Sequence, residues 1–204
     1  MVDILKCVKW IIFKLCNITT VDNTNINMKT VKSNNSYYII KLKDYILEYN
    51  NIDNIDNIDN IDNIDNIDIN NNNNTIKEQM FALLSQLTEA PSLIDNEFND
   101  ILNSQNERNL TFACIYNNKL VGLITILIET KFIHGGRKVA HIEDLVVDKK
   151  YRSKNIASLL LNYAKQYAEK YDCYKIILDC DQTLVPFYEK NNFFSNGVCM
   201  RYNL

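Results

Sequence analysis

The sequence predicts an α/β (α+β) fold in which helices flank a sheet, and three observations predict it. Strand-like and helix-like segments follow in the order strand, two helices, three strands, helix, strand, helix, strand. Two apolar runs, residues 110–116 and 120–129, are joined by Asn-Asn-Lys, which is typical of an antiparallel hairpin. Five apolar residues then recur every three or four positions, as on one side of an amphipathic helix: Ile156, Leu160, Tyr163, Tyr167 and Tyr171.

The remaining elements follow from local signals. Residues 37–42 (Tyr-Tyr-Ile-Ile-Lys-Leu) predict the first strand because they are aromatic and branched. Thr75 and Glu78 form a capping-box pattern that opens the first helix, and Pro91-Ser92 opens the second. Strands are also predicted over residues 139–147, 174–180 and 197–202, with a short helix over residues 185–190.

Size and charge favour one domain with appendages. The chain has 204 residues and a net charge of −3, so nothing in its total charge indicates nucleic acid or an anionic membrane. A small anionic substrate would have to be held by a few local basic side chains. We expect an N-terminal extension over residues 1–36, flexible, and one domain over residues 37–204.

A low-complexity insertion interrupts that domain at about residues 50–74. The triplet Asn-Ile-Asp recurs there, followed by a run of asparagines. A period of three matches neither a helix nor a strand, and one isoleucine in three residues cannot build a core, so disorder is expected. Such an insertion costs little stability because loop-closure entropy grows slowly with length.

The N-terminal residues 4–16 are apolar but are interrupted by three lysines, too short and too broken for a membrane span. A weak amphipathic helix that contacts a membrane or a partner remains open beside a loosely docked extension. The six cysteines form no C-x-x-C pair, and the two histidines have no metal-ligand spacing. Free thiols in a reducing, cytoplasmic compartment and no metal are therefore expected.

The junction between the strand ending at Val147 and the next helix predicts an anion site. Backbone N–H groups at a helix N-terminus point the same way, and together with the helix dipole they suit a pyrophosphate. Arg152 and Lys154 add positive charge beside them.

Residues 152–157 (Arg-Ser-Lys-Asn-Ile-Ala) resemble the acyl-CoA pyrophosphate loop of the GNAT superfamily, usually Q/R-x-x-G-x-G/A. Asn155 stands where the middle glycine belongs, and asparagine tolerates left-handed backbone angles. Five blocks, in order, are similar to glucosamine 6-phosphate N-acetyltransferase: residues 87–89, 129–134, 141–147, 173–180 and 185–191. The Phe-Ile-His and Cys-Tyr-Lys-Ile…Leu-Asp-Cys blocks distinguish that family from other GNAT members.

The resemblance implies the GNAT acyltransferase fold, with a central mixed, mostly antiparallel sheet, and a homodimer. It implies N-acetylation of glucosamine 6-phosphate by acetyl-CoA, for UDP-N-acetylglucosamine synthesis, through direct attack of the amine on the thioester. Such a site must aim a neutral amine, stabilise an oxyanion and support a departing thiolate. A GNAT enzyme for another amine, such as a protein N-terminus or a polyamine, and a non-catalytic acyl-CoA-fold binding module remain open.

The resemblance also implies site residues. Tyr188 would support the thiolate, while Glu143 and Asp179 would orient the amine and accept its proton. Substrate contacts are implied for Thr88, Lys131, His134, Glu143, Asp144, Tyr174, Lys175, Asp179 and Arg201. Cofactor contacts are implied for Leu145, Val146, Val147, Arg152, Ser153, Lys154, Asn155, Ile156, Ala157, Ser158 and Tyr188.

Four residues depart from the expected pattern or need a special backbone. Neighbouring residues on a strand face opposite sides, so Glu143 and Asp144 reach one sugar only if a β-bulge re-aims one of them. Alternatively, one of the two carboxylates serves another site across a dimer interface. Arg201, the candidate for the family's basic residue on the last strand, is displaced by about two residues, and Leu184 replaces the family's common asparagine.

Overall fold

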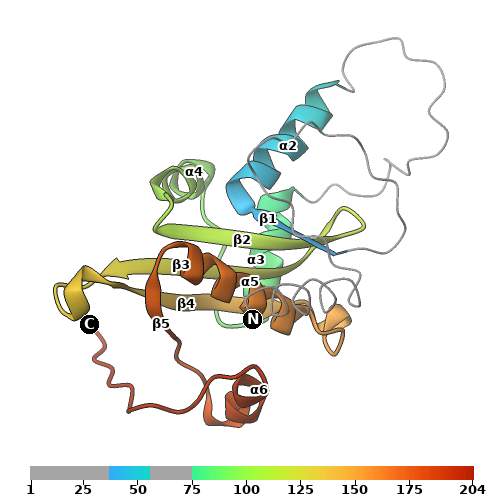
Figure 1. Cartoon of the computed structure of the whole chain (residues 1–204). Coiled ribbons are helices and arrows are strands. Elements are labelled where there is room, and N and C mark those ends of the chain that lie inside the picture. Colours follow the sequence, from blue (N-terminus) through green and yellow to red (C-terminus); the bar gives the residue numbers. More distant parts are fainter. Residues whose placement is uncertain (1–36, 56–74) are drawn as a thin grey trace, which may run out of the picture.

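A computed structural model describes residues 37–55 and 75–204 and contains one five-stranded sheet (Figure 1). The strands are β1 (Tyr38–Lys41), β2 (Asn109–Tyr116), β3 (Lys119–Thr130), β4 (Lys138–Val147) and β5 (Cys173–Ile177). They lie side by side in chain order, antiparallel except for the parallel pair of β4 and β5. The predicted mixed, mostly antiparallel sheet is thereby confirmed. The extension of residues 1–36 and residues 56–74 of the insertion lie outside the described part of the chain.

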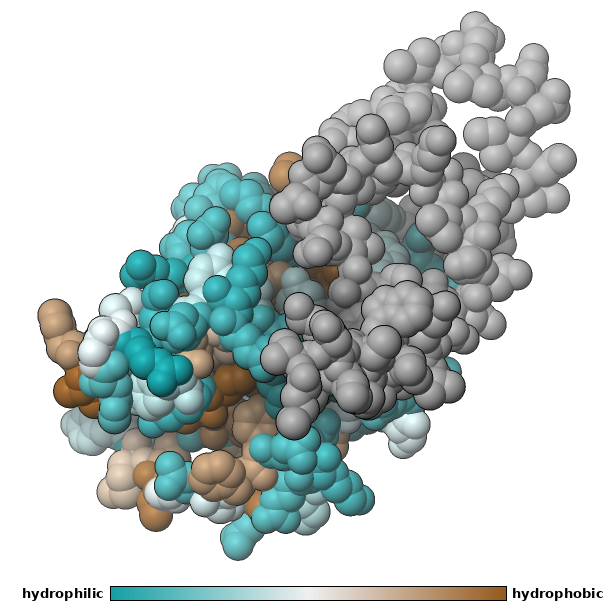
Figure 2. Space-filling view, in the orientation of Figure 1, coloured by the Kyte–Doolittle hydropathy of each residue, from teal (hydrophilic) through white to brown (hydrophobic). Residues whose placement is uncertain are grey.

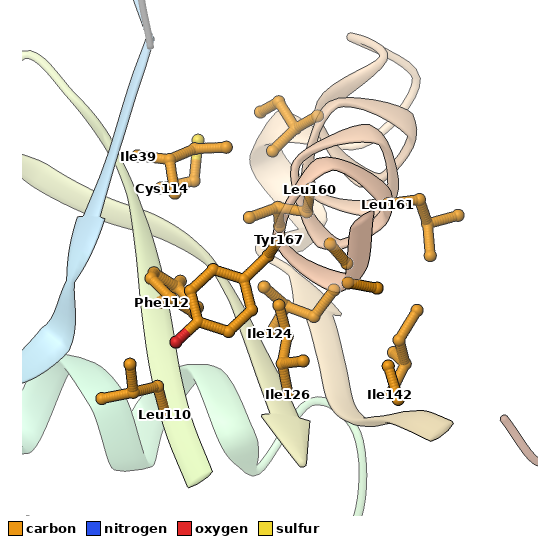
Figure 3. Close-up of a cluster of buried hydrophobic side chains, with 14 of the residues drawn as sticks. Ile39, Leu110, Phe112, Cys114, Ile124, Ile126, Ile142, Leu160, Leu161 and Tyr167 are labelled. Carbon is orange, nitrogen blue, oxygen red and sulfur yellow. The ribbon is translucent and has the colours of Figure 1, made fainter. Parts of the chain in front are cut away.

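Helix α5 (Ile156–Lys170) packs on one face of the sheet. Its buried residues Leu160, Leu161 and Ala164 join Phe112 and Ile124 of the strands in one hydrophobic cluster (Figure 3). The Tyr167 ring lies edge-on to Phe112 with 5.1 Å between ring centroids, and its hydroxyl donates a hydrogen bond to the Glu107 carbonyl. This face holds the larger of the two buried apolar clusters. It is therefore the main core, since burial of apolar side chains is the dominant favourable term in folding.

The opposite face is covered by α2 (Leu42–Ile55), α3 (Ile76–Leu84) and α4 (Asp95–Ser104). Residues from these helices and from the sheet form a second buried cluster: Leu42, Tyr45, Ile76, Leu83, Phe98, Leu102, Ala113, Ile115, Leu123 and Val146. The predicted capping box is present, because Thr75 accepts from the Glu78 N–H and Glu78 accepts from the Thr75 N–H. The helices therefore sandwich the sheet, as the sequence predicts.

Helix α2 is missing from the sequence prediction, which expects one insertion between the first strand and the helix at Thr75. The helix runs from Leu42 to Ile55 and so includes the first residues of the repeat, where disorder was expected. Leu42, Tyr45 and Tyr49 recur at helical spacing, and their packing on the second cluster stabilises the helix. The prediction missed α2 because it treated the polar repeat as disordered and gave no weight to the short helical spacing of Leu42, Tyr45 and Tyr49 before it.

The second predicted helix begins four residues late. Pro91-Ser92 lies in extended chain, and α4 starts at Asp95 after the N-cap residue Ile94. The later start places Phe98 and Leu102 in the core and lets Asp95 pair with Lys77 at 2.6 Å. Tertiary packing, rather than the proline, sets this boundary.

Two strand predictions near the C-terminus are corrected. Strand β5 ends at Ile177 instead of residue 180, because it pairs with β4 only over Lys138–His141. No strand forms over residues 197–202, which Figure 1 draws as an extended trace. Val198, Met200 and Tyr202 are each more than 85% exposed, so within the described residues this segment lacks the neighbour that a strand requires.

The sheet opens at the end of β4. Beyond His141, β4 has no β5 neighbour in the described residues. The β3 register also shifts, because Leu123 faces Val146 whereas Thr125 faces Glu143, leaving one extra residue in β4. This is a β-bulge, and Asp144 in it has a left-handed φ of 50°. The bulge at Glu143–Asp144, one of the two alternatives that the sequence left open, is therefore present, and it lies in the part of β4 that leads to α5.

Candidate active site

A cavity of about 810 Å³ lies where β4, the start of α5 and helix α6 (Val185–Lys190) meet. Residues 145–147 form one wall and residues 151–158, apart from Lys154, form another, while Tyr188 and its neighbours form the third. The predicted cofactor residues thus lie together, with Lys154 outside the lining. Their role in binding stays a prediction, but a cavity of this size with a few polar groups is typical of a small-molecule site.

The helix end of the cavity is cationic and presents backbone N–H groups. Asn155, the N-cap of α5, has a left-handed φ of 63° and makes no side-chain cap hydrogen bond. Ser153 is left-handed as well, with φ of 62°. The Arg152 side chain donates to the Val147 carbonyl at 3.1 Å, and Lys154 lies 5.0 Å from the Tyr151 ring centroid. The loop therefore adopts its turn without glycine and leaves the first N–H groups of α5 for a ligand.

Gly122 of β3 lets the elements behind this loop approach closely. A Cβ there would lie 3.1 Å from Leu160 Cδ1 and 3.2 Å from the Val146 carbonyl oxygen. A side chain would thus push β4 and α5 apart under the cavity floor.

Tyr188 lines the cavity from α6. Its ring packs edge-on against Phe187 and Phe193, with centroid distances of 5.1 and 5.9 Å. Burial, followed by the nearby Cys180 thiol, raises the pKa of the Tyr188 phenol, so the hydroxyl keeps its proton at neutral pH. A protonated phenol is the form that can donate to a departing thiolate.

Three predicted carboxylates interact at the open end of β4. Partial burial, then the charges of Asp144 and Asp179, raises the pKa of Glu143, while His141 opposes this shift. Asp179 follows β5 and accepts a hydrogen bond from the Cys199 thiol at 3.4 Å. Because the charges of Asp144 and Asp179 both act on Glu143, the three residues are called the acidic cluster. A carboxylate with a raised pKa is a better proton acceptor.

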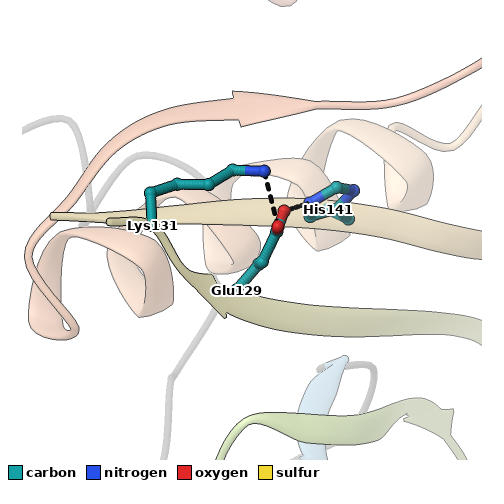
Figure 4. A network of polar contacts seen from close by, with 3 residues as sticks. All are labelled: Glu129, Lys131 and His141. Carbon is teal, nitrogen blue, oxygen red and sulfur yellow. Dashed lines mark hydrogen bonds and ion pairs between the residues drawn. The ribbon is translucent and has the colours of Figure 1, made fainter. Parts of the chain in front are cut away.

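Lys131 is tied to an acidic side chain rather than presented to solvent (Figure 4). Its ammonium lies 2.5 Å from Glu129 Oε1, and His141 Nε2 lies 3.0 Å from Glu129 Oε2. These two hydrogen bonds lower the pKa of Glu129, so the carboxylate is charged. Lys131 was predicted as a phosphate contact, yet in the free protein its charge is largely balanced by Glu129.

Three basic side chains, those of His134, Arg137 and Lys175, lie close to the ring of Tyr174. Tyr174 is the extra residue of an irregular step in the β4–β5 pairing, because Lys138 faces Cys173 whereas Val139 faces Lys175. The His134 ring lies 4.6 Å from the Tyr174 ring, centroid to centroid. Lys175 Nζ and the Arg137 guanidinium carbon lie 5.5 and 5.7 Å from the same centroid. The predicted residues His134, Tyr174 and Lys175 are thus brought together.

Two predicted substrate residues lie apart from these groups. Thr88 is exposed in the turn after α3, where its N–H donates to the Leu84 carbonyl. Arg201 lies in the exposed C-terminal segment, and its side chain donates to Asn203 at 2.7 Å. Its expected place on a last strand is not reproduced, for the reason given above.

Sequence reasoning missed several residues at the site. Gln86, Leu87, Tyr151, Phe187, Lys190 and Asn191 also line the cavity. Gln86 accepts from the Lys149 N–H at 2.8 Å, which ties α3 to the loop. Arg137 and Glu129 were missed as well. Glu129 has a signal in sequence, because it lies two residues before Lys131 and therefore on the same side of the chain.

Neither a metal-ligand cluster nor a membrane-spanning helix occurs in the described part of the chain. Across residues 37–55 and 75–204, no group of three or more His, Cys, Asp or Glu side chains is arranged to hold a metal ion. In the same ranges, none of the helices has the length and apolar character needed to cross a membrane.

Comparison with known proteins identifies the family. A family model described as Acetyltransferase (GNAT) family matches residues 77–193. Glucosamine 6-phosphate N-acetyltransferase from Trypanosoma brucei brucei is 36% identical over 125 residues, covering 60% of this chain and 85% of that protein. The enzyme of the same name from Dictyostelium discoideum, numbered 1, is 37% identical over 122 residues, covering 57% and 77%.

Solved structures agree with these relatives. A Trypanosoma brucei acetyltransferase superposes with a TM-score of 0.60 at 34% identity, covering 63% of this chain and 92% of that one. Arabidopsis thaliana glucosamine-6-phosphate N-acetyltransferase gives 0.58 at 29% identity, covering 60% and 87%. The chain belongs to the GNAT acetyltransferase family, within its glucosamine 6-phosphate N-acetyltransferases.

Proposed function

We propose that this protein is a glucosamine 6-phosphate N-acetyltransferase that moves the acetyl group of acetyl-CoA to the 2-amino group of the sugar. The observation that supports this most is that Glu143 of the acidic cluster and Lys175, one of the cations around Tyr174, lie on the same face of the sheet. An amine at one end of a small substrate and a phosphate at the other match the acidic cluster and the cations around Tyr174. The product would feed UDP-N-acetylglucosamine synthesis in the cytoplasm.

The residues around the cavity fit acetyl-CoA. Its pyrophosphate would be held by the N–H groups at the start of α5, with Arg152 and Lys154 nearby. The acetyl thioester that it supplies would lie along β4, where backbone donors at Leu145–Val147 face developing negative charge. The β4 bulge and the missing β5 neighbour explain why strand backbone is accessible at this point.

The acceptor amine must lose a proton to react. Glu143, with its raised pKa, would take this proton directly or through water, and Asp179 would hold the amine in place. Tyr188 would then donate its phenolic hydrogen to the sulfur that leaves. The reaction needs no covalent link to the enzyme, because the amine attacks the thioester itself.

A homodimer would complete the site. The apolar residues Val198, Met200, Tyr202 and Leu204 alternate along the exposed C-terminal segment. Alternation of this kind is typical of a strand, and pairing with a second copy would bury these side chains and bring Arg201 to a sheet. Figure 2 shows apolar side chains on the surface at the end of the molecule that holds the C-terminus. Deleting residues 197–204 should give a monomer by sedimentation; an unchanged dimer would exclude this arrangement.

A thiol-release assay with a panel of amines tests the proposed activity. Glucosamine 6-phosphate should be acetylated with a kcat/KM at least about tenfold above that of unphosphorylated glucosamine, because a charge-assisted phosphate contact is lost without the phosphate. Turnover of a polyamine or a peptide N-terminus, with none of glucosamine 6-phosphate, would contradict the proposal.

A further inference from the structure

The cations near the acceptor end differ in how far they are already neutralised. Lys131 is held by Glu129 at 2.5 Å, and Lys138 donates to the Tyr171 carbonyl at 3.0 Å. Arg137 has a looser partner, because its guanidinium lies 3.9 Å from an Asp172 carboxylate that is 79% exposed. Lys175 instead lies over the Tyr174 ring. Lys131 and Lys138 are therefore engaged in short contacts with protein oxygens, whereas Arg137 and Lys175 can meet an incoming anion without breaking such a contact.

The backbone holds these two cations close to each other. Arg137 comes directly before β4, and Lys175 lies on β5 opposite Val139, two residues further along. The irregular step at Tyr174 places its ring within 6 Å of both cationic groups. An aromatic face stabilises an arginine or lysine charge while leaving the N–H groups at its edge for a ligand.

The same sheet face leads from these cations to the acidic cluster. Ala140 and Ile142 join the core under α5, so His141 and Glu143 point to the opposite face. Ile176 also packs on the α5 side, which turns Lys175 to the face of Glu143. Lys175 is level with Val139, four residues from Glu143, or about 13 Å along the strand. Glu143 and Lys175 are thus separated along one face of the sheet, so that a single acceptor can have its amine near Glu143 and its phosphate near Lys175.

We propose that Arg137 is a specificity-determining residue that binds the acceptor's 6-phosphate together with Lys175, whereas Lys131 chiefly positions Glu129 and His141. This inference rests on the proposed function and adds to it a residue outside the recognised sequence blocks. The planar guanidinium can donate two parallel hydrogen bonds to phosphate oxygens, which the Lys131 ammonium cannot do. Asp172 is then a competitor that the phosphate displaces.

Kinetics of four variants with glucosamine 6-phosphate and with glucosamine test this role. Arg137→Ala should raise KM for the phosphorylated sugar about tenfold or more, as expected for loss of a charged hydrogen bond, and leave KM for glucosamine and for acetyl-CoA unchanged. Arg137→Lys should fall between Arg137→Ala and the wild type, because it keeps the charge without the fork. Lys119→Ala, at the exposed first residue of β3, is the charge-matched control and should behave as the wild type.

Asp172→Asn separates binding from a structural role of Arg137. If the arginine binds phosphate, removing its competitor should leave KM for glucosamine 6-phosphate unchanged or lower it about twofold. If Arg137 only braces Asp172, Asp172→Asn should instead reproduce the defect of Arg137→Ala, and the inference is wrong. It is also wrong if Arg137→Ala and Lys119→Ala give the same KM. A wild-type enzyme that does not turn over glucosamine 6-phosphate at all would contradict the proposed function instead.

Discussion

The two ends of the active-site face are built in different ways. The cofactor end consists of neighbouring residues, since β4, the loop and the first turn of α5 follow one another from Leu145 to Ser158. The acceptor end combines the β3–β4 connection, the irregular step at Tyr174 and the chain after β5. A site made from one continuous segment depends on local backbone geometry, whereas one made from separate segments depends on register. The acidic cluster of Glu143, Asp144 and Asp179 belongs to the acceptor end, and Glu143 and Asp144 directly precede the cofactor segment in the chain.

Removing the proton acceptor at the acceptor end should reduce the catalytic rate more than any of the other substitutions. Glu143→Gln keeps the shape of the side chain but cannot take the amine proton, so kcat should fall about 100-fold or more. KM for acetyl-CoA should stay close to the wild-type value, because the cofactor end is intact. Steady-state kinetics with both substrates measure this. Glu97→Gln, on the exposed surface of α4, is the matched control, and equal rates for the two variants would remove Glu143 from the chemistry.

The loop geometry of the cofactor end can be tested at Asn155. Its φ of 63° is tolerated by asparagine and glycine but costs a β-branched residue about 1–2 kcal/mol. Asn155→Val should therefore weaken acetyl-CoA binding about tenfold, whereas Asn155→Gly should bind at least as well as the wild type. Calorimetric titration with acetyl-CoA gives both affinities. Equal affinity of the valine variant would mean that this backbone turn is unimportant for the ligand.

Gly122 probes the packing beneath the cofactor end. Gly122→Ala should lower the free energy of unfolding by about 1–3 kcal/mol, because the new methyl group lies 3.1 Å from Leu160 Cδ1 and 3.2 Å from the Val146 oxygen. Chemical denaturation monitored by circular dichroism measures the change. Gly197→Ala is a contrasting variant at an exposed glycine, with nothing within 4 Å of the added Cβ but with a left-handed φ of 88°. If Gly122→Ala has the same free energy of unfolding as the wild type, β4 and α5 can move apart to fit the methyl group at no cost in stability.

A smaller effect is expected on the pKa of Glu143, and its direction follows from the charges of the acidic cluster. Asp144 is among the groups that raise the pKa of Glu143, so Asp144→Asn should lower that pKa toward its ordinary value. Glu143 would then remain a carboxylate, the form able to accept a proton, down to lower pH than in the wild type. Carbon-detected NMR titration of the Glu143 carboxyl measures this directly. An unchanged or raised pKa in the variant would mean that the two carboxylates do not interact.

Sequence reasoning succeeded where the structure depends on neighbouring residues. The hairpin, the α5 stripe, the capping box at Thr75 and the left-handed Asn155 were all predicted and are all present. A bulge at Glu143–Asp144 was one of two alternatives that the adjacent carboxylates left open, and the register shows that it is present.

The failures concern features that local patterns do not determine. Residues 197–202 have a strand-like pattern, but a strand also needs a partner, which the described chain does not supply. Helix α2 was hidden by the repeat that follows it, although Leu42 and Tyr45 gave a signal. Arg137 could not be found from sequence because its closeness to Lys175 depends on the extra residue in β5.

A crystal structure with coenzyme A and glucosamine 6-phosphate tests the whole arrangement most directly. We predict the pyrophosphate on the N–H groups at the start of α5, the sulfur beside Tyr188, and the sugar phosphate against Arg137 and Lys175. Coenzyme A bound away from the β4–α5 junction, leaving those N–H groups to solvent, would contradict the account.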